Sequence, residues 1–347
     1  MSARPHRATA VLLAAGALLT PAAAHAVAEP AADAPGLQRS AFSFGVIGDV
    51  PYGAEDLAQF PQDIASINAD HSLSFVTHVG DIKNGSTECS DELFAQVRAD
   101  FELFDAPLVY TPGDNEWTDC HRANNGGYDP LERLAALREL FFAEPGTTLA
   151  QDMKVESQAD QGFPENVRFA ERRVQFAVPH VVGSNNAAQP YTGAEATTPE
   201  QLAEVEARTE ASLQLIRDAF ADARQQNSRA VVVMLQADMF DPTVQDPRPE
   251  DYSSFRPIVQ LLAEESAAFD GPVHLFDGDS HVFHEDRPLA PGSEWLDFYG
   301  VAEPAANLTR VTVDGSGNAD NWLKVTVSPD AVRDGEVLSW EQVPLAD

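Results

Sequence analysis

The chain is short of positive charge. Its 347 residues include 22 lysines and arginines against 55 aspartates and glutamates, which gives a formal net charge of −33. A nucleic-acid backbone or an anionic membrane surface would repel such a protein, so neither is expected as a partner. The excess of acidic residues indicates a solvated surface suited to a salty exterior, and it identifies no reaction.

Long apolar runs are missing after the N-terminus, so no membrane span is expected there. Residues 1–26 have the pattern of a secretory signal peptide, because arginines precede a short apolar stretch and Ala24-His25-Ala26 fits the small-x-small cleavage sequence. The alternative is an uncleaved anchor, for which the apolar stretch is short. We expect a soluble protein, periplasmic or secreted after cleavage near Ala26, with residues 27–40 as a disordered mature N-terminus.

Cysteine is scarce, with two residues in the whole chain, Cys89 and Cys120. An even count in an oxidising compartment favours a disulfide, and this one would join two loops that each follow a predicted strand. Two free thiols are the alternative. The chain also has no Gly-x-Gly-x-x-Gly sequence and no Walker loop, which excludes the common nucleotide-binding folds.

Several apolar, β-rich runs of the chain end in the same dipeptide. Four such runs end in Gly-Asp, at Gly48-Asp49, Gly80-Asp81, Gly113-Asp114 and Gly278-Asp279. Ligands of open α/β sheets bind outside the carboxyl ends of the strands, and glycine there allows sharp turns. Four carboxylates at one sheet edge repel each other unless a cation lies between them, so the pattern predicts a metal site.

Strand and helix patterns alternate between these dipeptides, which predicts βαβ units and a mainly parallel sheet. Residues 144–170 have the composition of an insertion loop. The tail alternates apolar and polar residues and predicts an antiparallel finish, at residues 308–313, 322–327 and 338–343. The expected fold is α/β, a layered sandwich of mixed sheets flanked by helices.

The order of the motifs resembles the calcineurin-like metallophosphoesterase superfamily. That family carries Asp-x-His, Gly-Asp, Gly-Asn-His-Asp/Glu, a strand ending in His, and Gly-His-x-His. The corresponding stretches here begin at Gly48, Gly80, Gly113, Val231 and Gly278. The resemblance implies a single metallophosphoesterase-like domain over residues 41–347, which would hydrolyse a phosphate mono- or diester with metal-activated water.

The resemblance also implies metal ligands. Asp81 would bridge two ions, Asp49 and His281 would bind the first, and Asp114, Gln236 and Asp279 occupy the positions of the second ion's ligands. Imidazole is absent at four family positions, which hold Pro51, Asn115, Gln236 and Asp279. Oxygen donors favour Mg, Mn or Ca over Zn, with Fe as a further candidate, and the protein is expected to bind one or two ions.

The same departures remove the family's usual proton donor, because Asn115 stands where the family has His. His121 and His284 are candidates to replace it, together with Asn115 itself as a catalytic contact. Lys83, Asn115 and Glu116 are candidate substrate-binding residues at the same sheet edge, where Tyr52 also lies. Lys83 has a second interpretation, as a partner of Asp81.

Two rival functions remain open at this point. Gly278-Asp279-Ser280 superficially resembles the nucleophile motif of a lipase-like hydrolase, although that family places its serine after the first strand. The stronger rival is a metallophosphoesterase fold with weakened catalysis that acts as a metal, ligand or partner binding protein, because four imidazoles are missing. The expected partner of an enzyme of this kind is a small phosphorylated substrate, and the sequence leaves the oligomeric state open.

Overall fold

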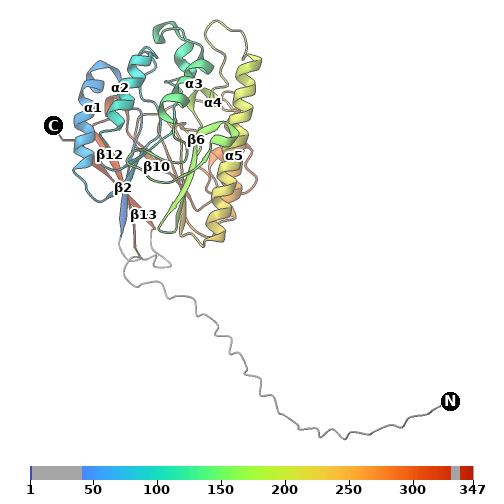
Figure 1. The fold of residues 1–347 in the computed structure, drawn as a ribbon. Coiled ribbons are helices and arrows are strands. Elements are labelled where there is room, and N and C mark those ends of the chain that lie inside the picture. Colours follow the sequence, from blue (N-terminus) through green and yellow to red (C-terminus); the bar gives the residue numbers. More distant parts are fainter. Residues whose placement is uncertain (2–40, 330–336, 347) are drawn as a thin grey trace. The chain divides into compact units, whose positions relative to one another are not determined.

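A computed structural model describes Met1 and residues 41–329 and 337–346. The predicted cleavage site near Ala26 and the predicted disordered segment 27–40 therefore lie outside the described residues. Residues 41–329 and 337–346 form two β-sheets with helices on their outer faces (Figure 1). In the part of the chain that is described, no helix is long and apolar enough to cross a membrane.

The first sheet has six strands in the order β13-β12-β1-β2-β3-β4. Its strands are β1 (Phe42–Ile47), β2 (Leu73–His78), β3 (Pro107–Tyr110), β4 (Leu149–Ala150), β12 (Asn321–Val327) and β13 (Leu338–Pro344). β1, β2 and β3 are parallel, while β4, β12 and β13 each pair antiparallel with a neighbour. The three parallel strands therefore deliver their carboxyl ends to one edge.

The second sheet has seven strands in the order β10-β11-β9-β8-β7-β6-β5. Its strands are β5 (Glu156–Gln158), β6 (Phe163–Glu171), β7 (Val174–Val178), β8 (Ala230–Met234), β9 (Val273–Asp277), β10 (His284–Asp286) and β11 (Leu308–Thr312). The four central strands, β7, β8, β9 and β11, are parallel. β8 is buried along its whole length, as its uninterrupted apolar sequence predicts.

Helices cover the outer face of each sheet, and apolar side chains of both sheets fill the space between them. The helices are α1 (Gly53–Asn68), α2 (Asp91–Phe101), α3 (Pro130–Phe141), α4 (Gly183–Asn186), α5 (Pro199–Gln225), α6 (Arg256–Ala267) and α7 (Glu294–Tyr299). α1, α2 and α3 share a core with the first sheet, and α5 and α6 with the second.

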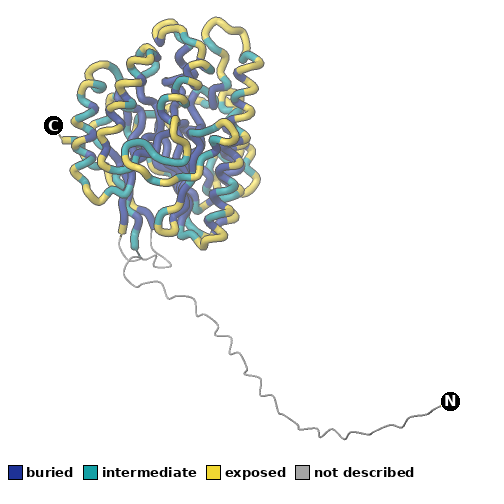
Figure 2. The backbone as a smooth tube through the Cα atoms, viewed as in Figure 1, coloured by how far each residue is buried: buried dark blue, intermediate teal, exposed yellow. Residues whose placement is uncertain are grey.

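The core between the sheets includes stacked and edge-on rings of Phe44, Phe75 and Phe176. Figure 2 shows the buried backbone concentrated in this middle region. The order of layers is helix, sheet, sheet, helix, which confirms the predicted layered α/β sandwich.

Two predictions about the sheets were wrong. Residues 144–170 are not a plain insertion loop, because they contain β4, β5 and most of β6. Pro164 and the preceding Gly162 obscured the alternation of β6, whose Val167 and Phe169 are buried between the sheets. β11 was expected to be antiparallel, and it is so to β10, but it lies parallel to β9 and adds a strand to the central parallel set.

A disulfide joins Cys89 and Cys120, whose Cα atoms are 5.8 Å apart. It connects the loop after β2 with the short helical turn Thr118–His121 after β3. Closing a loop of this length stabilises the folded chain by roughly 3–4 kcal/mol in the chain-entropy model. The bridge therefore fixes two loops that follow Asp81 and Asp114.

Candidate metal centre

The four Gly-Asp dipeptides follow β1, β2, β3 and β9, and their aspartates converge at the carboxyl ends of both sheets. Asp49, Asp81 and Asp279 have positive φ angles of 56°, 59° and 69°, which non-glycine residues adopt rarely. The glycines allow the close approach: a Cβ atom on Gly113 would lie 2.5 Å from the backbone nitrogen of Asp81. Strained backbone of this kind concentrates at functional sites.

The converging side chains form two groups that could hold a cation. Asp49, Asp81 and His281 form the first cluster, and Asp81, Asp114 and Asp279 form the second cluster. In each, the possible ligand atoms lie within 4.8 Å of one another, and Asp81 belongs to both. The structure thus brings together five of the six side chains that the sequence proposed as metal ligands.

Donors of the chain itself surround the carboxylates of the first cluster. Asp49 Oδ1 lies 3.2 Å from His281 Nε2 and accepts a hydrogen bond from the Tyr52 hydroxyl, also at 3.2 Å. Asp49 Oδ2 accepts the backbone N–H of Asp279 at 3.0 Å. Both oxygens of this completely buried carboxylate therefore have partners.

Asp81 receives donors from Tyr52 and Asn115. The backbone N–H of Asn115 donates to Asp81 Oδ1 at 3.0 Å, and its side-chain amide donates to Oδ2 at 2.7 Å. The Tyr52 hydroxyl oxygen lies 3.1 Å from the same Oδ2, so its single proton is shared between Asp49 and Asp81. Asn115, proposed as a catalytic and substrate contact, is thus hydrogen-bonded to the carboxylate that both clusters share.

The second cluster has fewer donors. The Ser184 hydroxyl donates to Asp114 Oδ2 at 2.6 Å. Among residues 41–329 and 337–346, no side-chain or backbone donor is recorded for the carboxylate of Asp279. Two of the three carboxylates here are poorly neutralised by the chain, which is the arrangement that a bound cation would stabilise.

Burial and mutual repulsion raise the pKa values of these acids. Burial, followed by the charges of Asp114, Glu116, Asp49 and Asp279, raises the pKa of Asp81 well above its usual range. Burial and the charges of Asp114 and Asp49 do the same to the pKa of Asp279. Burial also raises the pKa of Asp114, although the Ser184 hydrogen bond and Arg122 oppose it. A cation between the carboxylates would reverse these shifts.

Gln236, the sixth proposed ligand, lies against the second cluster but presents a different group. Its Oε1 accepts the backbone N–H of Gly183 at 2.6 Å, and a Cβ atom on Gly183 would be 2.8 Å from Asp279 Oδ2 and 2.9 Å from Asp114 Oδ2. Its Nε2 is completely buried and has no hydrogen-bond partner within residues 41–329 and 337–346. An orphaned buried donor beside carboxylates fits an anionic oxygen better than a cation.

Ser184 is presented by a backbone turn of unusual geometry. Ser184, Asn185, Asn186 and Ala187 all have positive φ angles between 54° and 64°, so α4 contains a left-handed turn. Such residues cost on the order of 1–2 kcal/mol each and need support from their surroundings. Two consecutive asparagines, Asn185 and Asn186, are the signal in the sequence that could have indicated this turn.

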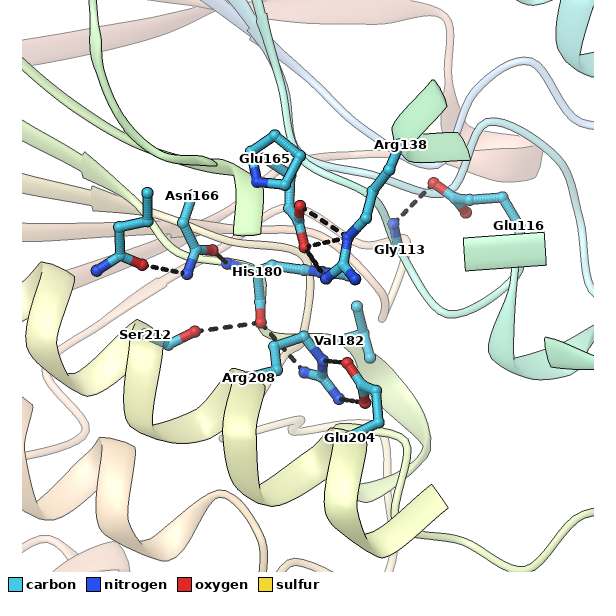
Figure 3. A network of polar contacts seen from close by, with 12 residues as sticks. Gly113, Glu116, Arg138, Glu165, Asn166, His180, Val182, Glu204, Arg208 and Ser212 are labelled. Atoms are coloured by element: carbon cyan, nitrogen blue, oxygen red, sulfur yellow. Dashed lines mark hydrogen bonds and ion pairs between the residues drawn. The ribbon is translucent and has the colours of Figure 1, made fainter. Parts of the chain in front are cut away.

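That support comes from a buried polar network around Arg208 of α5 (Figure 3). The Arg208 guanidinium donates to the backbone carbonyls of His180 and Asn186 at 3.1 and 3.0 Å, and to the side chain of Asn186. Glu204, one turn earlier on α5, pairs with it at 2.7 Å. The network thus fixes both ends of the segment that carries Ser184.

Glu116 and Lys83, proposed as substrate contacts, are buried supports of the loops instead. Glu116 Oε1 accepts the backbone N–H groups of Gly113 at 2.7 Å and Asp81 at 3.2 Å. Lys83, which is 1% exposed, donates to the carbonyl of Asn115 at 2.6 Å and is not paired with Asp81. A direct contact of either side chain with substrate finds no support in this arrangement.

The candidate proton donors His121 and His284 interact with residues outside both clusters. His121 Nδ1 accepts the backbone N–H of Thr192 at 3.0 Å, and His284 lies 3.4 Å from Asp286. His78, the last residue of β2, lies closer to the site. It accepts the N–H of Gly80 at 3.1 Å and contacts the carbonyl of Val50 at 2.8 Å, so it positions both strand ends.

Ser280 is not arranged as a nucleophile. Its hydroxyl donates to Asp238 Oδ2 at 2.8 Å, and Asp238 pairs with the buried Arg310. A serine nucleophile needs a base that is free to take its proton, whereas this carboxylate already holds a guanidinium. The contact instead anchors the turn between Asp279 and His281.

Comparison with known proteins yields distant structural matches. No protein-family model and no curated protein matches the chain. Similar solved structures include a purple acid phosphatase from yellow lupin seeds (12% identity, TM-score 0.42), GAP50, the anchor in the inner membrane complex of Plasmodium (8%, 0.40), and a 5'-nucleotidase precursor from Thermus thermophilus (10%, 0.43).

Each match covers 88% of this chain, and 54%, 90% and 55% of the respective matched chains. The chain therefore spans about half the length of the purple acid phosphatase and of the 5'-nucleotidase. At these identities and TM-scores the similarity to the three structures is distant.

Proposed function

We propose that this protein is a metal-dependent phosphoric ester hydrolase whose site lies at Asp49, Asp81, Asp114, Asp279 and His281. The observation that carries the proposal is the convergence of these five side chains from loops after four strands of two sheets. They form two groups that share Asp81, and in each group the possible ligand atoms lie within 4.8 Å of one another. Carboxylates held this close together repel one another, and a cation between them would remove that repulsion.

The donor set fits a hard divalent cation. The second cluster offers carboxylate oxygens alone, and the first adds one imidazole. Oxygen donors of this kind suit Mg, Mn or Ca better than Zn. A cation bound there would polarise a phosphoryl oxygen and the attacking water, which is the chemistry that ester hydrolysis requires.

Other side chains of the protein would orient the metal ligands and contact the substrate. Ser184 and the buried Arg208 network orient Asp114, while Asn115 and Tyr52 orient Asp81. The unpartnered Nε2 of Gln236 can donate to an anionic oxygen of the substrate. Arg122, which is 40% exposed and pairs with Asp119 at 2.5 Å, places a positive charge next to Asn115 in this otherwise acidic protein.

A turnover assay tests the proposal. The purified protein is tried on aryl phosphate mono- and diesters with Mg, Mn, Ca and Zn, beside Asp81→Asn. Asp100→Asn is the matched control, because Asp100 is also buried but pairs only with Gln96 on α2. We expect cation-dependent hydrolysis that Asp81→Asn abolishes and Asp100→Asn preserves. Activity that survives in Asp81→Asn would contradict the proposal.

A second function has its own support in Asn115. The amide of this residue donates to Asp81 and Tyr52 and cannot supply a proton to a leaving group as an imidazole does. We infer as the alternative a protein that binds a cation or a ligand at this site without efficient turnover. Stoichiometric cation binding without hydrolysis of any ester in the assay would favour it.

A further inference from the structure

The Tyr52 hydroxyl lies in the middle of the first cluster. Its oxygen is 3.2 Å from Asp49 Oδ1, 3.1 Å from Asp81 Oδ2 and 3.3 Å from His281 Nε2. Those three side chains are the ones that could hold an ion in this cluster. The Asn115 amide also donates to this oxygen at 3.0 Å, so the hydroxyl is held from four sides.

This hydroxyl and the neighbouring donors satisfy the first cluster without a cation. Each oxygen of Asp49 and Asp81 has at least one donor or cationic partner in the chain. Hydrogen bonds and a nearby imidazole stabilise a buried carboxylate as a counter-ion does. An ion entering here would have to displace the Tyr52 hydroxyl from both carboxylates.

The second cluster lacks such a substitute. Ser184 is the recorded side-chain donor to Asp114, and the described residues give the Asp279 carboxylate none. Among the described residues the buried Nε2 of Gln236 also has no partner, and as a donor it suits an oxygen of a water or ligand that a cation holds, not the cation itself. The need for a cation is therefore concentrated on Asp81, Asp114 and Asp279.

We propose that the Tyr52 hydroxyl occupies the position of a first ion, so that the protein binds a single divalent cation, held by Asp81, Asp114 and Asp279. This inference rests on the cation site of the proposed function and fixes the number of ions. Removal of the Tyr52 side chain frees Asp49, Asp81 and His281 to hold a second ion, because three protein ligands plus water form an adequate open site.

Native mass spectrometry with Mn²⁺ measures the number of ions directly. We expect one Mn²⁺ per chain in the unmodified protein and two in Tyr52→Ala at the same free Mn²⁺ concentration. Tyr128→Ala is the matched control, because the Tyr128 hydroxyl bonds Glu88 outside both clusters, and it should keep one ion. Circular dichroism establishes that each variant is folded.

Two ions in the unmodified protein, or one in folded Tyr52→Ala, would overturn the inference while leaving the proposed function intact. No bound ion at all would overturn both. If Tyr52→Ala does not fold, the ion count of the unmodified protein and of Tyr52→Phe decides the matter. Tyr52→Phe should bind at least one ion, and the unmodified protein must bind one and not two.

Discussion

The two carboxylate clusters share Asp81 and differ in how the chain neutralises them. In the first cluster Tyr52, Asn115, His281 and a backbone N–H contact the carboxylates. In the second, Asp114 has one hydroxyl partner and Asp279 has no recorded donor among the residues described. The two clusters have similar residue types and similar burial. The chain supplies hydrogen-bond donors to the carboxylates of the first cluster, whereas the second cluster is left as the candidate cation site.

The difference follows from which loops contribute. Tyr52 comes directly after the β1 loop and begins α1, so it reaches the carboxylates of the first cluster. Both clusters combine loops of the two sheets, because Asp279 and His281 lie in the same loop after β9. The segment next to the second cluster is the left-handed turn that contains Ser184, and that turn offers a single hydroxyl. The clusters therefore differ in the donors beside them, Tyr52 and Asn115 for the first and Ser184 for the second.

The largest expected effect is on ion affinity. Asp279→Asn removes a ligand of the second cluster alone and should weaken Mn²⁺ binding roughly 100-fold or more, as the loss of a charged ligand does. Asp49→Asn should weaken it less than about 10-fold, because Asp49 belongs to the first cluster. Isothermal titration calorimetry compares the two variants. Equal losses would show that the clusters do not differ in the way described.

Acid should destabilise the support of the first cluster. Burial lowers the pKa of His78 to about 4, against the opposing effects of the Val50 hydrogen bond and Asp49. Its folded pKa lies below the unfolded value, so the stabilising contribution is complete above about pH 6.5 and is lost as the pH falls toward 4. The loss is on the order of 2–3 kcal/mol.

Urea unfolding of metal-free protein between pH 7 and pH 4 measures this effect. His78→Phe should flatten the pH dependence of the unfolding free energy. His274 is the matched control, since burial also lowers its pKa to about 4 but neither of its ring nitrogens has a partner. His274→Phe should flatten the profile similarly and leave Mn²⁺ affinity unchanged. An unfolding free energy that still falls as steeply with pH in His78→Phe would contradict this role of His78.

Substitution of Asp279 and of Asp49 by asparagine should have opposite effects on the stability of metal-free protein. Asp279→Asn relieves repulsion within the second cluster and should raise the unfolding free energy by about 1 kcal/mol. Asp49→Asn disturbs a satisfied hydrogen-bond network and should lower it by about 1–2 kcal/mol. Unfolding in the presence of a chelator gives both values. Destabilisation by both variants would mean that the second cluster is also self-sufficient.

The smallest effect is expected from Ser184→Ala. Loss of the 2.6 Å hydrogen bond to Asp114 leaves the carboxylate less well oriented, and Mn²⁺ affinity should fall about 2- to 5-fold. Ser72→Ala is a matched control, because the Ser72 hydroxyl also bonds an aspartate, Asp70, on the exposed surface. An effect as large as that of Asp279→Asn would indicate that Ser184 contacts the ion itself.

The sequence predicted the layers of the fold because most strands and helices carry clear periodicity, as in the continuously apolar β8 and the capped α5. It also predicted the convergence of Asp49, Asp81, Asp114 and Asp279, since the carboxyl ends of parallel strands meet at one edge. It expected a single sheet edge, however, whereas Asp279 follows β9 of the second sheet. Both inferences depend on local pattern and general topology.

The roles of the individual side chains inside the site could not be predicted in the same way. Lys83 and Glu116 have the residue types of substrate contacts, but their charged groups are buried and bond to the backbone. Lys83 donates to the carbonyl of Asn115, and Glu116 accepts the backbone N–H groups of Gly113 and Asp81. The left-handed turn at Ser184 depends on Arg208, which is 22 positions beyond Asn186 in the sequence. Contacts between distant segments decide such roles, and no short sequence window contains them.

Diffraction from crystals grown with Mn²⁺ tests the central claim most directly, because anomalous scattering locates each ion. The account predicts one anomalous peak per chain, between the carboxylates of Asp81, Asp114 and Asp279, with the Tyr52 hydroxyl still between Asp49 and His281. A peak between Asp49, Asp81 and His281, or no peak near any of these carboxylates, would contradict it.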